Sequence, residues 1–520
     1  MSRGVRRLRD LSVPALLLLG AAALIGAILA GDAWLPDPSP AQVATVDWDI
    51  DAGTVHCPVT VAVDEDDEEE PPEEAAVVSI AAGAEPSAVE VVQDGTVLTA
   101  ETVEPDSRLT VEVDATAAVD VSWRDAPVAV TWHRADARTV GGPCIDGAAS
   151  TVYFAGVNTS LGSSARLHLA NPFGIDAVVR VWYGTSDGRR DLVRTDNVAV
   201  PSGQTEVLDL VDLQPEQPEL GVVVETLAGR VIGQVEVDRV RLDGDASGAQ
   251  GRTLIEPVTE PAVIWRLAGA RENENWTGAV TVFNPSDRQA AVVVRTTDPA
   301  ADDPAEQILI PAGATERISL ADRAEEDRFA VTVESVNDVG VIVAGVEANP
   351  ASGRPGYSVR PGTPVTATSW LYAGLAGDRV EELAVFNPGA EDVTVTVTVD
   401  GQPLADWEQQ TVEAFSVAFV GDIDAPARVT ADGPVVVDAF SAFDEGGDRS
   451  HVLFTALALR DLSVATLPVA RNPVLATEPV LPPGSVLDDD DDGRAFRRFD
   501  DLGGDDDEAA DDDDEGDAED

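Results

Sequence analysis

One short segment of the sequence matches a motif that carries nucleophilic catalysis. Residues 184–188 (GTSDG) fit the GxSxG pattern, in which a serine lies on a sharp turn between a strand and a helix. Here strand-like sequence lies on both sides of Ser186. A later copy of the internal repeat described below has a plain hairpin turn, Asp400-Gly401, in a nearby position. The pattern therefore predicts a β-hairpin, and we expect no catalytic residue.

Side chains that could bind a metal ion are scattered along the chain. Two histidines at i and i+2 or i+4 would lie on one face of a strand or helix. No such pair occurs among the four histidines, which are His56, His133, His168 and His451. His168 alternates with two leucines, which predicts a ring that faces solvent.

The acidic C-terminal region comes closest to a cation site. Asp488, Asp490 and Asp492 fit the first, third and fifth positions of an EF-hand loop, and Gly493 fits the sixth. Position twelve is Phe499 where a glutamate is needed, and no helices flank the loop. We interpret the segment as low-complexity acidic sequence and expect neither a metal site nor a cofactor.

Cys57 and Cys144 are the only cysteines of the chain. An even number of cysteines that bracket one repeat favours a disulfide formed in an oxidising compartment. The alternative is a pair of buried free thiols.

The elements that must position these residues come from an internal repeat. Three segments begin with an aromatic residue and an Ala-Gly pair, then reach Asn-Pro through an alternating strand. Proline sets the backbone angle of a tight turn, and an asparagine side chain can bond back to the turn backbone. The asparagines follow one another at intervals of 113 and 103 residues and are Asn171, Asn284 and Asn387. A degenerate fourth copy lies nearer the N-terminus, with Ala81-Ala82 in place of Asn-Pro.

Strand patterns dominate every copy of the repeat. Residues 393–399 (VTVTVTV) put valines on one face and threonines on the other, as a half-buried strand requires. About seven short strands in each copy of about 105 residues are typical of an immunoglobulin-like sandwich. The predicted fold class is therefore all-β, with four tandem immunoglobulin-like β-sandwich repeats, although the Cys…Trp…Cys core of antibody domains is missing.

The two ends of the chain differ from the repeats. An apolar run of 18 residues, 13–30, follows four arginines and would span about 27 Å as a helix. It predicts a single-pass anchor with a cytoplasmic N-terminus and an extracytoplasmic body, and a signal peptide cleaved near residues 31–33 is the alternative. At the other end, 19 of the 33 residues from 488 to 520 are acidic, which predicts a disordered tail.

The whole chain is strongly acidic. It has 95 acidic and 34 basic residues, a net charge of −61, and no lysine. Such a charge repels phosphate backbones, so nucleic acid is excluded as a partner. The predicted organisation is a basic stub with a membrane segment, four repeats, a Pro-rich linker and an acidic tail, at residues 1–35, 45–146, 147–258, 259–364, 365–470, 471–487 and 488–520 respectively.

These motifs carry a resemblance to a known family. Residues 56–58 (HCP), 132–134 (WHR) and 141–144 (GGPC), together with the aromatic-Ala-Gly and Asn-Pro elements, span about 45–470. The chain resembles an uncharacterised family of actinobacterial secreted or membrane-anchored proteins, known only as a domain of unknown function. The resemblance implies a role in the cell envelope and supplies no active-site residues.

We therefore expect a non-enzymatic extracytoplasmic protein of the cell envelope, acting as a scaffold or adhesive stalk. Its partner would be an envelope protein or glycan, and its N-terminal helix would bind the membrane. The first alternative is a glycan-binding module that uses exposed aromatic residues such as Trp182, Tyr183, Trp276 or Trp407. The second alternative is an enzyme of unknown type.

Overall fold

The computed structural model describes most of the region between residues 53 and 458. The described ranges are 53–57, 75–114, 117–134, 140–146, 149–240, 250–298, 306–321, 323–349, 356–375, 379–421, 423–445, 448–455 and 457–458. Contacts divide the chain into two units, Met1–Leu462 and Ser463–Asp520, and all described residues belong to the first. The predicted anchor at 13–30 and the predicted tail at 488–520 lie outside the described residues. None of the helices that are described is long and apolar enough to cross a membrane.

The described chain forms antiparallel sheets that pair as sandwiches, so the predicted all-β sandwich fold is confirmed. We name the four sandwiches the first to fourth repeats in chain order. In the second repeat, one sheet has the order β10 (Thr151–Val157), β16 (Leu220–Ala228), β12 (Ala177–Thr185) and β13 (Gly188–Asp191), with β14 (Val198–Val200) also beside β12. The facing sheet has the order β15 (Thr205–Asp209), β11 (Ser163–Ala170), β17 (Ile232–Arg239) and β18 (Gly251–Ile255).

The other repeats share this order. The third repeat contains β19 (Ile264–Arg271), β24 (Arg328–Ser335), β21 (Ala290–Thr296) and β22 (Gln307–Ile310), facing β23 (Thr315–Ser319), β20 (Thr277–Phe283), β25 (Ile342–Asn349) and β26 (Gly356–Pro361). The first repeat contains β4 (Thr96–Val103), β3 (Ser87–Gln93), β6 (Val119–Arg124), β1 (Gly53–Cys57) and β9 (Ile145–Asp146), facing β5 (Arg108–Asp114), β2 (Ala75–Ala82), β7 (Val128–Arg134) and β8 (Val140–Pro143).

In the fourth repeat one long strand, β33 (Ala427–Glu445), takes part in both sheets. The first sheet contains β30 (Gln402–Pro403), β31 (Gln410–Val412), β29 (Val393–Val399), β27 (Ala367–Tyr372) and β35 (Leu457–Ala458), and the second contains β32 (Ser416–Val420), β28 (Arg379–Asn387) and β34 (Asp448–Thr455). The short helical turns are η1 (Val193–Thr195), α3 (Leu210–Leu213) and η2 (Ala405–Trp407).

The strand order differs from that of an immunoglobulin sandwich. In that fold the first strand lies beside the second, and the seventh lies beside the sixth. Here β10, which corresponds to the first strand, pairs with β16 and not with β11. Strand β17, which corresponds to the seventh, pairs with β11 and not with β16. Alternating valines show which face of a strand is buried but not which strand lies next to it, so the sequence could not separate the two orders.

The Asn-Pro elements form the predicted turns. Asn284 is fully buried, and its Nδ2 donates to the carbonyls of Arg288 at 2.7 Å and Ile310 at 3.1 Å. Its Oδ1 accepts the backbone N–H of Ser286 at 3.1 Å. Asn171 and Asn387 make the matching bonds in their repeats. Each asparagine thus ties its own turn to the end of a later strand, and the predicted bond from side chain to turn backbone is confirmed.

In the first repeat a glycine takes the place of this asparagine. The carbonyl of Gly83 accepts the N–H of Asp106 at 2.9 Å, just as the carbonyl of Asn171 accepts the N–H of Gly203 at 2.8 Å. The turn position is therefore Gly83, directly after the Ala81-Ala82 pair to which the sequence comparison assigned it.

Replacing Asn284 with alanine should lower the free energy of unfolding by about 2–3 kcal/mol, because several buried carbonyls would lose their donor. Denaturant unfolding of the purified protein measures the change. Asn275 lies exposed on a neighbouring turn, so Asn275→Ala serves as the matched control and should change stability little. Equal effects of the two substitutions would contradict this role for Asn284.

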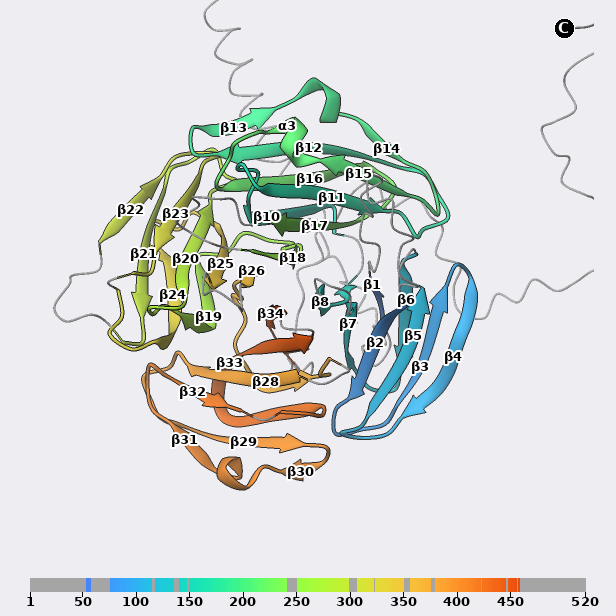
Figure 1. Cartoon of the computed structure of the whole chain (residues 1–520), viewed down its shortest axis with the longest axis vertical. Coiled ribbons are helices and arrows are strands. Elements are labelled where there is room, and N and C mark those ends of the chain that lie inside the picture. The colour runs from blue at the N-terminus through green and yellow to red at the C-terminus, as the bar shows by residue number, and fades with distance from the viewer. Residues whose placement is uncertain are drawn as a thin grey trace, which may run out of the picture. The chain divides into compact units, whose positions relative to one another are not determined.

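The four repeats close into a ring of contacts (Figure 1). One strand of each repeat lies toward the centre, where β18 contacts β26, β26 contacts β34, β34 contacts β8, and β8 contacts β18. The fourth repeat therefore lies beside the first. The described repeats therefore do not follow one another end to end in a row.

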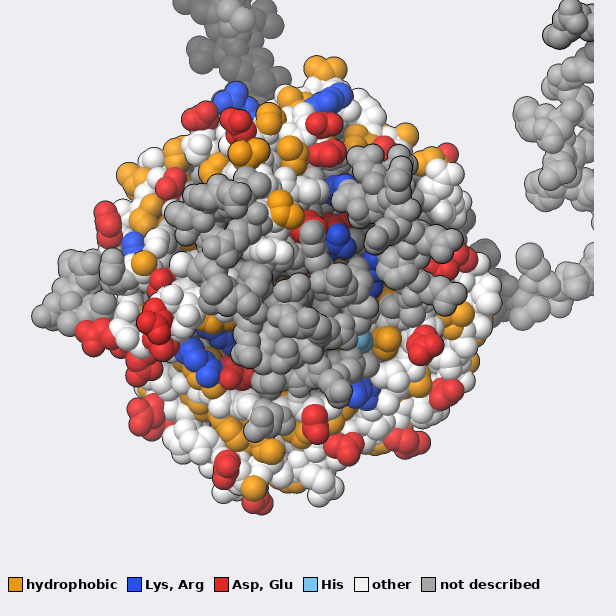
Figure 2. Space-filling model, in the orientation of Figure 1, with side chains coloured by type: hydrophobic (Ala, Val, Ile, Leu, Met, Phe, Trp, Pro, Cys, Tyr) orange, Lys and Arg blue, Asp and Glu red, His pale blue; other side chains and the backbone are white. Residues whose placement is uncertain are grey.

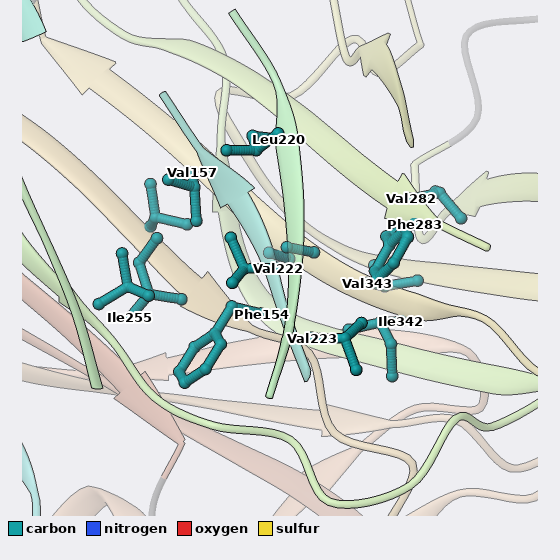
Figure 3. Packing of buried hydrophobic residues seen from close by; sticks show 14 of the residues in the cluster. Phe154, Val157, Leu220, Val222, Val223, Ile255, Val282, Phe283, Ile342 and Val343 are labelled. Carbon is teal, nitrogen blue, oxygen red and sulfur yellow. The ribbon is translucent and has the colours of Figure 1, made fainter. Parts of the chain in front are cut away.

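Neighbouring repeats share apolar cores. One hydrophobic cluster runs through the second and third repeats, and Figure 3 shows Val223 of β16 beside Ile342 of β25 within it. The Ala-Gly pair of the repeat motif lies at these contacts. A Cβ added to Gly156 would approach Val359 Cγ1 to 2.8 Å, and one added to Gly269 would approach the Cβ of Ala384 to 2.9 Å. The motif's glycines therefore permit the next repeat to pack closely.

Candidate functional site

The most unusual chemistry of the described structure is a group of charged side chains buried where the second, third and fourth repeats meet. Arg360 of β26 is 2% exposed, and its Nη1 donates to Oδ2 of Asp438 in β33. Its Nη2 lies 3.8 Å from Oε1 of Glu347 in β25. Asp438 also accepts the backbone N–H of Ala268 at 2.6 Å. These bonds link two strands of the third repeat to the long strand of the fourth.

A second arginine extends the group toward the outside. Nη1 of Arg271 lies 3.6 Å from Oε2 of Glu347, and Nη2 donates to Glu382 of β28 at 3.1 Å. The guanidinium also lies over the ring of Phe440, 3.6 Å from its centroid. Arg328 completes the group by pairing with Glu382. This row of paired charged side chains thus crosses the interface between the third and fourth repeats.

Burial shifts the pKa values of Arg271 and Glu347. It lowers the pKa of Arg271 below its ordinary value, an effect that Glu347 and Glu382 oppose. It raises the pKa of Glu347, against the attraction of Arg271 and Arg360. Both shifts reflect the cost of holding a charge away from water.

Glu256, which directly follows β18, is the member contributed by the second repeat. Burial raises its pKa to about 8, the nearby charge of Asp438 adds to the rise, and Arg360 opposes it. Some of its surface stays accessible, although protein atoms surround the carboxyl. We call Arg271, Arg328, Arg360, Glu256, Glu347, Glu382 and Asp438 the central cluster. With Glu256 protonated, its three arginines balance its three remaining carboxylates.

The sequence prediction that His168 faces solvent is wrong. His168 is 3% exposed, and its Nε2 lies 3.2 Å from Oε2 of the equally buried Glu236. Both faces of β11 are covered along this stretch, since the first repeat packs on the second. Leu254 of β18 shows this contact, because it lies in the hydrophobic core of the first repeat. Alternation identified two faces, but it could not reveal that a neighbouring repeat covers the outer one.

His56 and His133 both lie in the first repeat. Nδ1 of His56 lies 2.6 Å from Oδ1 of Asp120, and His133 is buried in β7. The side chain of His451 and the acidic loop at Asp488 lie outside what is described. Among the described residues, no three His, Cys, Asp or Glu side chains gather as metal ligands.

The GxSxG segment forms the predicted hairpin. Thr185 at the end of β12 pairs with Gly188 at the start of β13, so Ser186 lies in a tight turn between two strands. The strand–turn–helix geometry of a nucleophile elbow is not what this segment adopts.

Three of the four aromatic residues considered for glycan binding are buried. Trp182 is 3% exposed, Tyr183 is fully enclosed, and Trp407 is 9% exposed. Trp276 is partly buried and lies edge-on to Phe440, with ring centroids 6.1 Å apart. A sugar cannot stack on a buried ring, so the expectation of an exposed aromatic platform is wrong for Trp182, Tyr183 and Trp407.

Cys57 of β1 and Cys144, the residue after β8, form a disulfide. The bridge links the two sheets of the first repeat and closes 87 residues. Thiol titration of the denatured, unreduced protein should therefore find no free thiol, and reduction should release two per chain. Two free thiols before reduction would contradict the bridge.

The central cluster was not predicted from the sequence, although a signal was present. Glu347 interrupts an apolar strand, IVAGVEAN, and Asp438 follows three valines in β33. A lone charge within a strand that is buried on both faces requires a partner from another element. The sequence could have flagged these positions, but the charged partners lie up to 111 residues apart, as Arg271 and Glu382 do, and only the fold brings them together.

Comparison with protein families identifies a matching family. It matches a family of unknown function (DUF5719) over residues 99–263 and again over residues 240–458. The chain belongs to this family. The predicted resemblance to a domain of unknown function is confirmed. A search of curated proteins finds no match. The two DUF5719 matches overlap at residues 240–263, which include β18 and Glu256, so the segment shared by both matches contributes directly to the central cluster.

Proposed function

We propose that this DUF5719 protein is a non-enzymatic extracytoplasmic component of the cell envelope. Its four repeats form a rigid closed scaffold, and the rim of that scaffold binds an envelope protein. The observation that carries the proposal is the closure of the ring through specific buried polar contacts. Closure gives a defined platform, whereas repeats in a row would give an extended arm.

The junction between the fourth and first repeats supports this proposal. Arg428 donates to both carboxylate oxygens of Asp106, at 2.9 and 3.1 Å, across 322 residues of sequence. Nearby, the Oγ1 of Thr131 donates to the carbonyl of Gly374 at 2.6 Å. Bidentate and buried polar contacts favour one arrangement over its competitors more than they add stability. Such contacts are what we expect in a protein that must hold its repeats in one fixed arrangement.

The location rests on two features, and the surface charge bears on the class of partner. The disulfide of the first repeat favours an oxidising compartment. The arginine-flanked apolar segment 13–30 would anchor the chain with its body outside, unless cleavage near residues 31–33 releases it. Acidic side chains are spread over the surface seen in Figure 2, in keeping with the net charge of −61. Such a surface favours neutral or basic partners over nucleic acid.

Protease accessibility in intact cells tests the location. Protease added outside should digest the ring while a cytoplasmic marker stays intact, and N-terminal sequencing of the native protein separates an anchor from a cleaved signal. Recovery of the chain in the cytoplasmic fraction with reduced cysteines would overturn the proposal. A pull-down on isolated cell wall provides the second measurement, because strong binding to purified glycan would favour a glycan-binding module instead.

A further inference from the structure

The outer edge of the first repeat differs from the same edge in the other three. Strand β4 (Thr96–Val103) is the edge strand of its sheet and pairs with β3; within the described ranges no other strand pairs with it. Six of its eight residues are exposed, including the apolar side chains of Val97 and Leu98. An edge strand presents unpaired backbone N–H and C=O groups, which another extended chain can use.

The equivalent edges of the other repeats are short or interrupted. In the second repeat the edge consists of β13, the turn η1 and the three-residue β14. In the third repeat it is the four-residue β22, and in the fourth it is β30, the turn η2 and β31. Short, broken edges discourage pairing with another chain. In the first repeat this edge is one strand of eight residues, whose pairing with β3 shifts register between Val91 and Val92.

A hollow lies beside this edge. It has a volume of about 420 Å³, and its lining includes Ala88, Glu90, Ala100, Glu101, Ser122 and Arg124. On this face Ala100 and Ser122 pair with Glu90 from its two sides, and Ala88 pairs with Thr102 and Arg124, so small side chains alternate with larger ones. Glu90 and Arg124 line the hollow, while the side chain of Glu101, next to Ala100 on β4, alternates to the other face of the sheet. A side chain from a strand added to β4 could enter the hollow, and a basic one would meet the carboxylate of Glu90.

The charge around the edge selects among possible occupants. Residues 85–104, which include β3 and β4, contain five acidic residues and no basic one. A second copy of this chain, with its net charge of −61, would be repelled. An extended segment that alternates basic with β-branched residues would instead gain both backbone pairing and charge attraction.

We propose that β4 accepts an extended basic peptide segment of a partner protein by strand addition, with a Lys or Arg side chain of that segment in the hollow. This inference deepens the proposed function by naming one binding surface and one class of partner. It does not depend on the ring's stability, so its failure leaves the closed scaffold intact.

Hydrogen exchange on the full-length protein tests the proposal. The probe is a synthetic ten-residue peptide that alternates lysine with valine or threonine. The control peptide has proline in place of each valine, which keeps the charge but prevents strand pairing. Saturating probe should slow amide exchange within residues 96–103, and the proline peptide should not. Equal binding of both peptides, or no protection of β4, would overturn the proposal.

Two variants locate the site. Ala100→Lys places a positive charge in the hollow, and Glu101→Lys reverses a carboxylate of the edge strand itself; each should weaken probe binding by about tenfold or more. Glu206→Lys makes the same charge change on the exposed edge strand β15 of the second repeat and should leave binding within about twofold. If Glu206→Lys weakens binding as much as Glu101→Lys, the peptide is attracted by the net charge of the protein and not by β4, which contradicts the proposal. Concentration-dependent dimers with β4 protected in the absence of peptide would assign the edge to a second copy instead.

Discussion

Replacing Arg360 with alanine is expected to lower the free energy of unfolding by about 3–5 kcal/mol. The substitution leaves Asp438 and Glu347 buried, each without the guanidinium that now faces it. Glu256 lies close enough for the charge of Asp438 to raise its pKa, so the uncompensated charge adds to an acidic neighbourhood. An unpaired buried carboxylate must either take up a proton or admit water, and both outcomes weaken the junction of three repeats.

Denaturant unfolding measures this loss, and two further variants interpret it. Arg190→Ala removes an arginine whose pairing with Asp187 is solvent-exposed and should cost no more than about 1 kcal/mol. The double variant Arg360→Met with Asp438→Leu removes both members of the buried pair and should recover much of the loss, because apolar side chains of similar size need no partner. A single variant as stable as the native protein would show that the central cluster does not hold the repeats together.

Stability is also expected to depend on pH through Glu256. In the folded protein its pKa is about 8, against an ordinary value of 4.5. Between those values the folded state keeps a proton that the unfolded chain has released, so the contribution is complete below about pH 4.5 and is lost as the pH rises to about 8. Each pH unit in this window lowers the free energy of unfolding by at most about 1.4 kcal/mol. Because part of Glu256 remains accessible, we expect a total of about 2–4 kcal/mol.

The difference between Glu256→Gln and the native protein isolates this effect from all other titrations. Glutamine keeps the size of the side chain and cannot ionise. The variant should gain stability relative to the native protein as the pH rises from 5 to 8, and the difference should level off above that. Glu260→Gln, at an exposed position four residues away, should show no such trend. A flat difference for Glu256→Gln between pH 5 and 9 would mean that Glu256 is ionised in the folded protein.

Much of the architecture could be predicted because it depends on local rules. Alternation of valine with threonine in β29 identified a half-buried strand, and Asn-Pro identified turns that Asn284 indeed closes through its own side chain. The hairpin at Ser186 followed from the strand-like sequence on both sides. In each case the residues that decide the structure lie within a few positions of one another, or on one strand.

The features that could not be predicted depend on contacts between repeats. His168 was expected to face water because its own sandwich leaves that face open, and only the adjacent repeat buries it. The partners of Asp438 come from the third repeat, and the partner of Asp106 comes from the fourth. Periodicity contains no information on such pairings, so the closed ring and its central cluster appeared only in three dimensions.

Closure of the ring also limits how such a protein can change length during evolution. In an open solenoid, a repeat can be added or lost at an end, because each unit contacts only its neighbours in sequence. Here Asp106 of the first repeat is bonded to Arg428 of the fourth, so the ring of described repeats has no open end at which to add a unit. Deleting any one repeat would leave two unmatched surfaces, and deleting the second, third or fourth would also divide the central cluster. We therefore expect relatives that share this arrangement to vary in their loops and outer edges while keeping four repeats.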